Sequence, residues 1–178
     1  MENSMNNKTS VIDRFFAGLA QYVFQTRLGV ADPPLVDYVS DLLKRFVNTD
    51  SLLKVRNPRG QQLSRLAEMM GEAEARVGDA KRDIHQHIGD FALFWAGLYP
   101  ETLQPREGRD AYDLFTDYCV QGKRAYLVAS SIPSSTEEAP GEILERLSDQ
   151  FEMCAYGLRE VRREWERRDD DTPPLLIG

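Results

Sequence analysis

The sequence predicts an all-α fold, a single-domain bundle of about six helices around one buried central helix at about residues 79–98. Apolar residues recur at spacings of three and four through most of the chain, which is the helical period. Alternation with a period of two, bounded by turn residues, is missing from the sequence. A chain of 178 residues, 42% of them hydrophobic, is also long enough to bury one core without disulfide or metal support.

Three helices are expected before the central one, at about residues 11–28, 32–46 and 61–77. Gly29 follows the first of them and is placed to end it. Asp32 can cap the second, because the two prolines after it are tolerated in a first helical turn. The stretch 48–60 contains Asn-Pro and Arg-Gly and is expected to be a connection.

The central helix and two further helices are expected at about residues 79–98, 110–131 and 142–168. Asp79 is the expected N-cap of the central helix, and Tyr99 ends it because a residue before proline is disfavoured in the helical region. The polar stretch 132–141 is expected to be a loop. The domain organisation predicted is a disordered N-terminus at 1–9, one helical domain at 10–168 and a C-terminal tail at 169–178.

Charge and cysteine content restrict the classes of function. The 29 acidic residues outweigh the 22 basic ones, which disfavours attraction of the whole molecule to nucleic acid or to an anionic membrane. The longest apolar run has nine residues, against about 20 for a spanning helix. No signal peptide is visible, so a cytoplasmic location is expected. The two cysteines, Cys119 and Cys154, fit neither a disulfide scaffold nor a cysteine zinc site.

The central helix is apolar on nearly every side, which is typical of a helix buried in the middle of its domain. One face carries large residues, namely Ile84, His87, Ile88, Phe91, Phe94, Trp95 and Leu98. Most of the other side carries shorter ones, namely Gly89, Ala92, Leu93, Ala96 and Gly97. Glycine in a helix interior costs about 0.5–1 kcal/mol relative to alanine, so close packing of a neighbour against this side is expected to compensate.

Asp90 is the acidic residue of this apolar helix that needs an explanation, because a buried carboxylate requires a partner. His87 is within side-chain reach, and Lys123 or Arg124 of the next helix are candidates from elsewhere. A structural pair that fixes the register of the helices is one interpretation. A proton-transfer or ligand-binding pair of His87 and Asp90 is the other.

A metal site is not predicted, and no cofactor is expected. His85 and His87 diverge by about 200° on a helix, so one ion cannot readily bind both. The Glu-x-x-His spacing of di-iron bundles is also missing. The sequence contains no P-loop, no dinucleotide-binding glycine pattern and no Gly-x-Ser-x-Gly elbow.

The last helix carries a heptad pattern that suits either packing within the chain or a seam between two subunits. Its members are Leu144, Leu147, Phe151, Cys154, Leu158, Val161 and Trp165. The arginines near its end, at 159–168, are interspersed with glutamates and are expected to form a solvated face rather than a nucleic-acid patch.

Three parts of the sequence resemble an uncharacterised family of helical bacterial proteins. They are HIGDFALF at 87–94, GLYPE at 97–101, and Tyr118 followed by Gly122, Lys123, Ala125 and Tyr126. The resemblance covers less than a third of the chain. It implies a helical fold and a bacterial source, brings no established activity, and directs attention to Asp90, Glu101 and Tyr126 as a cluster joining two helices.

Two functions remain open from the sequence. The first is a non-catalytic helical interaction or regulatory module, homodimeric through the heptad seam at Leu144, Leu147, Phe151, Leu158, Val161 and Trp165. The second is a helical enzyme, or a binder of a cofactor or small ligand, that uses a pocket near His87 and Asp90. The binding residues expected for it are His87, Asp90, Trp95, Glu101, Lys123 and Tyr126. Nucleic-acid binding through the terminal arginines is a weaker third interpretation.

Overall fold

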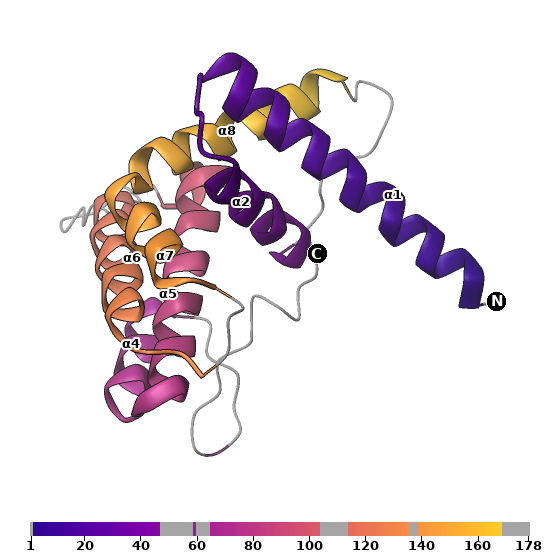
Figure 1. Ribbon diagram of the computed structural model, residues 1–178. Helices are drawn as coiled ribbons and strands as arrows, with labels where there is room; N and C mark the ends of the chain where they lie inside the picture. Colours follow the sequence, from indigo (N-terminus) through magenta and orange to yellow (C-terminus); the bar gives the residue numbers. More distant parts are fainter. Residues whose placement is uncertain (1, 47–58, 60–64, 104–113, 136–138, 169–178) are drawn as a thin grey trace.

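The computed structural model describes residues 2–46, 59, 65–103, 114–135 and 139–168 (Figure 1). The described residues form an all-α fold, as the sequence predicts. Its α-helices are α1 (Glu2–Gln21), α2 (Pro33–Phe46), α4 (Leu66–Glu74), α5 (Gly78–Leu98), α6 (Leu114–Ser131), α7 (Gly141–Asp149) and α8 (Phe151–Arg168). A π-helix, η1 (Tyr22–Arg27), follows α1, and a 3-10 helix, η2 (Pro100–Leu103), follows α5.

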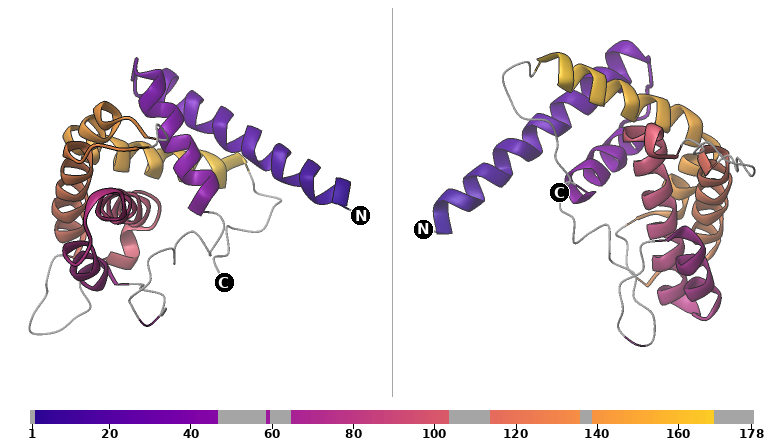
Figure 2. Two further views of the ribbon diagram at one scale, coloured as in Figure 1. Left: turned by 60° about the horizontal axis from the view of Figure 1, so that its bottom comes forward. Right: turned by 180° about the vertical axis from the view of Figure 1, so that it is seen from behind.

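Helix α5 is the centre of the packing, because it contacts α2, α4, α6 and α8. Helix α6 lies along one side of α5, α7 packs in turn on α6, and α8 crosses the end of α5 that carries Leu98 (Figures 1 and 2). Helices α1 and α2 form a second layer, in which α1 packs on α2 and α8. All residues of α5 from His87 to Leu98 are buried apart from the half-buried Trp95, which confirms the predicted central helix.

The N-terminal part of the chain differs from the prediction. Helix α1 begins at Glu2, where the sequence predicts a disordered segment over 1–9. Figures 1 and 2 show its first half running out beyond the other helices. The expected single helix at 11–28 is divided, because its last part winds as η1. Gly29 then takes a left-handed conformation, with φ of 66°, and ends the segment as predicted.

The two helix N-caps expected from the sequence have different outcomes. Asp32 caps α2 as predicted, and its Oδ1 accepts a hydrogen bond from the Leu35 amide at 3.3 Å. Asp79 lies inside the first turn of α5, because the helix begins at Gly78. Its carboxylate instead accepts hydrogen bonds from the amide and hydroxyl of Ser135, so it holds the chain beyond α6 rather than its own helix end. The connection at 48–60 lies outside the described residues except for Arg59, and the tail at 169–178 lies wholly outside them.

The predicted last helix is two helices, and this changes the meaning of its heptad pattern. The chain bends at Gln150, so that α7 packs along α6 while α8 crosses α5 and reaches α1 and η1. One straight helix would not make both sets of contacts. The seam residues from Leu144 to Val161 are at most 1% exposed, and Trp165 packs edge-on against the rings of Phe15 and Phe16. The predicted dimer seam is therefore wrong, because the chain's own helices cover it.

The side of the central helix that carries the smaller residues packs closely against its neighbours, as predicted. A Cβ atom added at Gly89 would lie 2.6 Å from the ring of Tyr126, and one added at Gly97 would lie 2.7 Å from Leu158 Cβ. Helix α6 contributes Gly122 in the same way, since a Cβ atom there would lie 2.5 Å from the ring of Phe151. Glycine is thus required at these crossings because there is no space for a methyl group.

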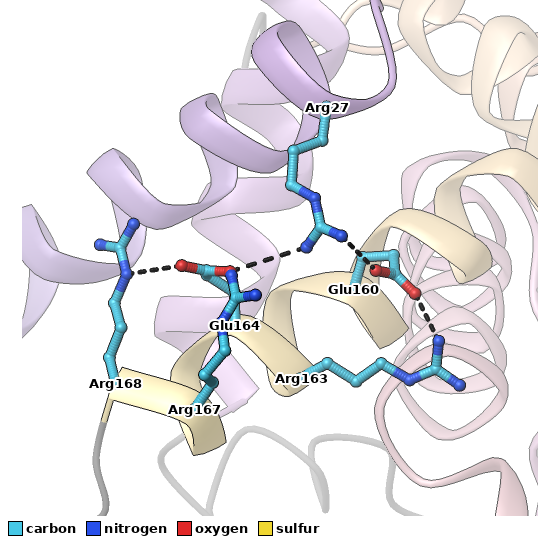
Figure 3. A network of polar contacts seen from close by, with 6 residues as sticks. All are labelled: Arg27, Glu160, Arg163, Glu164, Arg167 and Arg168. Carbon is cyan, nitrogen blue, oxygen red and sulfur yellow. Dashed lines mark hydrogen bonds and ion pairs between the residues drawn. The ribbon is translucent and has the colours of Figure 1, made fainter.

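Two buried glutamates of α8 hold the end of η1 (Figure 3). Glu160 and Glu164 are 5% and 4% exposed, and Arg27 contacts both carboxylates, at 3.3 and 3.6 Å. The other cations of the network come from α8 itself and are Arg163, Arg167 and Arg168. Arg163, Arg167 and Arg168 are exposed, as the predicted solvated face requires. Glu160 and Glu164 are instead buried, and through Arg27 they join α8 to η1.

Replacement of Glu164 with glutamine is expected to lower the free energy of unfolding by about 1–2 kcal/mol, because hydrogen bonds to a charged acceptor contribute about 1.5–3 kcal/mol. Glu166 on the same helix provides the control. Its side chain is 58% exposed and pairs with Arg162, so Glu166→Gln should change stability by less than about 0.5 kcal/mol. Urea unfolding followed by circular dichroism measures both variants, and equal effects would contradict the role given to Glu164.

Candidate functional site

The polar centre of the molecule is the carboxylate of Asp90, which is 1% exposed. Its Oδ1 accepts hydrogen bonds from the hydroxyls of Tyr38 and Tyr126, both at 2.7 Å. Its Oδ2 accepts a hydrogen bond from Nη1 of Arg45 at 3.0 Å, in a charged pair. We call these four residues the Asp90 cluster.

Three helices meet in the Asp90 cluster. Helix α2 supplies Tyr38 and Arg45, which are seven residues apart and therefore on one face. Helix α5 supplies Asp90, and α6 supplies Tyr126, whose ring packs edge-on against that of Tyr38 at 6.4 Å. Gln86, one turn before Asp90, donates a hydrogen bond from Nε2 to the Tyr38 hydroxyl at 3.0 Å. The cluster thus ties α2 to the α5–α6 pair.

The family resemblance directs attention to Asp90, Glu101 and Tyr126 as one cluster, and the structure brings together Asp90 and Tyr126 but not Glu101. The expected partners Lys123 and Arg124 are wrong, since the cation comes from α2. Lys123 turns away and pairs with Glu152 of α8 at 2.9 Å. The missed residues, Tyr38 and Arg45, have one sequence signal, which is their position beside the apolar residues of α2.

The environment of the cluster keeps both tyrosines protonated. Burial raises the pKa of Tyr126 well above its usual value of 10.0, and the neighbouring charge of Asp90 raises it further. The same two causes, in the same order, raise the pKa of Tyr38. Burial acts to lower the pKa of Arg45, but the charge of Asp90 outweighs it and the pKa is raised. The cluster therefore favours neutral hydroxyls on Tyr38 and Tyr126 and a positive charge on Arg45.

Stability is expected to fall at alkaline pH for this reason. A tyrosine whose pKa is raised on folding contributes stability that is present below its unfolded pKa, about 10, and is lost as the pH rises through the folded value. The free energy of unfolding should therefore decrease from about pH 9 upward. Urea unfolding at a series of pH values measures this, with Tyr38→Phe as the control. A slope above pH 10 that this variant leaves unchanged would contradict the prediction.

A pocket of about 290 Å³ opens beside the cluster. It is lined by Tyr38, Asp41, Arg45, Asp83, Gln86, His87 and Asp90. His87 is 3% exposed, and its ring stacks on Phe46 with 5.8 Å between ring centroids. Since three donors already engage the Asp90 oxygens, this geometry favours the structural interpretation of the carboxylate over a role as a proton acceptor for substrate.

The remaining predicted binding residues lie elsewhere. Trp95 belongs to an aromatic group on α5, with ring centroids 6.3 Å from Phe91 and 5.5 Å from Phe94. Glu101 lies on η2 and pairs with Arg162 of α8. The charge and hydrogen bond of Arg162 lower the pKa of Glu101 although burial opposes the shift. The six predicted binding residues therefore do not form one site.

The described residues contain no group of three histidine, cysteine or acidic side chains arranged to hold a metal ion. The same part of the chain has no helix with the length and apolar content that crossing a membrane requires.

Both cysteines are buried, and we expect them to be inert in the folded protein. Cys154 is fully buried, and burial raises the pKa of its thiol to about 12. Cys119 is 6% exposed. A thiol must ionise to react, so Ellman's reagent at about pH 8 should leave the native protein unlabelled and should label both cysteines in concentrated guanidinium chloride. Rapid labelling of the native protein would contradict this prediction.

The fold and the site define a class, an all-α domain whose central helix carries a buried aspartate held by two tyrosines and an arginine. Comparisons of the chain with protein-family models, with curated proteins and with solved structures find no match.

Proposed function

We propose that the chain is a non-catalytic helical interaction module that forms a homodimer through an exposed face of α1 that continues onto the first residue of η1. The main observation in support is that large apolar side chains remain exposed on this face. Val11, Phe15 and Tyr22 are 60%, 40% and 39% exposed, and they follow one another at intervals of four and seven residues. These intervals place all three on one side of a helix. Together with Gly18, which lies between them on the same side, we call them the α1 stripe.

The α1 stripe suits a second copy of the same helix. Gly18 is exposed, and a Cβ atom added there would meet no atom within 4 Å. Two antiparallel helices that cross at Gly18 can approach closely, because neither has a side chain at the crossing point. A two-fold axis there places Phe15 of each copy beside the segment that carries Tyr22 in the other.

Charge also favours this face for self-association. The chain carries a net charge of −7, which opposes contact between copies in general. Helix α1 contains two acidic and two basic residues and is neutral. A contact between two α1 helices therefore avoids most of the repulsion.

The non-catalytic part of the proposal is supported by the Asp90 cluster. Its carboxylate, its two hydroxyls and its guanidinium are bonded to one another. Groups engaged in this way stabilise helix packing and are poorly placed to exchange protons with a substrate.

Sedimentation equilibrium over a wide range of protein concentration tests the proposal. The wild-type chain should show a dimer that dissociates on dilution. Gly18→Gln should weaken association by about tenfold or more, equivalent to at least about 1.4 kcal/mol, because its side chain separates the helices. The same substitution replaces a helix-interior glycine and should not destabilise the monomer, so loss of the dimer cannot be ascribed to unfolding.

Val120→Gln is the matched control. Val120 is 54% exposed on α6, outside the α1 stripe, and its replacement should leave the association constant unchanged. A wild-type chain that sediments as a monomer at every concentration would overturn the proposal. A dimer weakened by Val120→Gln and not by Gly18→Gln would overturn the choice of face.

A further inference from the structure

A second pocket lies away from the Asp90 cluster, between α4, α5 and α6, and has a volume of about 340 Å³. Helix α4 contributes Met70 to its wall, α5 contributes His85 and Ile88, and α6 contributes Arg124 and Val128. The volume is near the lower end of small-molecule sites, which span about 300–1,000 Å³. A small ligand would therefore fit.

His85 is the residue of this pocket whose unused hydrogen-bonding groups indicate a ligand. Its side chain is 7% exposed, and neither ring nitrogen has a hydrogen-bond partner in the part of the chain that the structure describes. Leaving a buried polar group without a partner costs about 1–3 kcal/mol, so native proteins pair most such groups. His85 therefore has hydrogen-bonding capacity that the fold does not use.

The charges around His85 favour an anion. Burial lowers the pKa of His85, and the charge of Lys81 lowers it further, so the ring is neutral at pH 7 and has one N–H to donate. Glu74, the acidic residue of the wall, has Nζ of Lys81 at 3.8 Å. Arg124 has no ion-pair partner within the described ranges and contributes an uncompensated positive charge at the wall.

Most of the rest of the wall is apolar, and the amide of Gln121 is its remaining polar side chain. Met70, Ile88 and Val128 line it with thioether and hydrocarbon surface. This surface suits a hydrocarbon chain better than a fully hydrated ion such as inorganic phosphate. The ligand class indicated has an anionic end and a short apolar body.

We infer that this pocket binds a small aliphatic monocarboxylate. Its carboxylate pairs with Arg124 and accepts a hydrogen bond from the ring of His85, and its hydrocarbon chain packs on Met70, Ile88 and Val128. The ring nitrogens are shielded from solvent in the structure, so binding includes rotation of the ring about its Cβ–Cγ bond. The outline of the ring changes little in a half-turn, and this torsion has broad, two-fold preferences.

Titration of the full chain with sodium hexanoate, followed by the ring signals of the histidines in ¹H–¹³C NMR spectra, tests the inference. The chain has two histidines, so a His87→Gln variant assigns both signals. The expected result is a saturable shift of the His85 signals with a much smaller effect on His87. A shift that increases linearly without saturation would overturn the inference.

Variants and probes of matched shape test the roles of charge and chain. Arg124→Gln should weaken hexanoate binding by about tenfold or more, whereas Lys123→Gln, which removes a neighbouring cation paired with Glu152, should leave it unchanged. Hexylamine has the same chain with the opposite charge and should not bind. Inorganic phosphate should bind much more weakly than hexanoate. Equal binding of hexylamine, or of phosphate, would overturn the assigned ligand class.

His85→Leu separates binding from folding. The variant removes the buried group without a partner, so it should unfold at the same temperature as the wild type or at a higher one. Hexanoate binding to it, measured by saturation-transfer NMR on the ligand, should be about tenfold weaker or lost. Unchanged binding by this folded variant would overturn the role of His85.

Discussion

Replacement of Asp90 with alanine is expected to lower the free energy of unfolding by about 3 kcal/mol. The substitution leaves the buried hydroxyl of Tyr126 without its acceptor and takes one acceptor from Tyr38, and each such loss costs about 1–3 kcal/mol. Arg45 loses its ion-pair partner at a smaller cost, because its side chain is 42% exposed and stays hydrated. Urea unfolding followed by circular dichroism measures the change.

Two further substitutions show whether the effect arises from the cluster. Asp90→Asn keeps an oxygen that can accept from both tyrosines and should cost about 1 kcal/mol, well below the alanine variant. Asp41→Ala removes a carboxylate from the rim of the same pocket, where it is 65% exposed and pairs with Lys44, and should cost less than about 0.5 kcal/mol. Similar losses for Asp90→Ala and Asp41→Ala would show that the cluster contributes little to stability.

Gly89→Ala is expected to lower the free energy of unfolding by about 2 kcal/mol. The added methyl group would lie 2.6 Å from two ring carbons of Tyr126, a side chain that is fully buried. The ring cannot move aside easily, because its hydroxyl is bonded to Asp90 at 2.7 Å. Overpacking of this kind costs about 1–3 kcal/mol and outweighs the gain of about 0.5–1 kcal/mol from alanine in a helix.

Gly71→Ala is the control for the stability gained when alanine replaces glycine inside a helix. Gly71 lies within α4, and a Cβ atom added there would meet no atom within 4 Å. This variant should be more stable than the wild type by about 0.5–1 kcal/mol, so the two alanine variants should differ in sign. If Gly89→Ala also stabilised the protein, the close contact between α5 and Tyr126 would be wrong.

Asp90→Ala and Gly89→Ala both affect the position of Tyr126, because this side chain contacts both residues. The effect of the double variant should therefore be smaller than the sum of the single effects. Once the Asp90 carboxylate is absent, Tyr126 is free to move away from the methyl group at position 89. Additive losses would indicate that the two contacts are independent.

The features that follow from helical periodicity were predictable from the sequence. The apolar residues of 79–98 surround a helix on nearly every side, and such a helix must be buried wherever its neighbours come from. Close packing against the small-residue side of this helix was predictable for the same reason, since Gly89 and Gly97 leave room that only a closely packed neighbour fills. Capping of α2 by Asp32 is local as well, because donor and acceptor are three residues apart.

Features that depend on distant segments could not be predicted in this way. The bend at Gln150 has no proline or glycine at the junction, and it arises because α7 and α8 pack on different partners. The same packing decides that the heptad residues from Leu144 to Val161 are buried within the chain. Periodicity defines an apolar face and does not identify the surface that covers it.

The candidate sites also combine features that the sequence predicts with features that depend on contacts between distant segments. The sequence is enough to predict that a carboxylate at Asp90 in an apolar helix needs a partner, because burial of an unpaired charge is unfavourable in any fold. The packing of α2 against α5 identifies this partner as Arg45, 45 residues earlier in the chain, together with two tyrosine hydroxyls. The position of His85 in the wall of a pocket, without a hydrogen-bond partner among the described residues, likewise depends on distances between side chains of different helices.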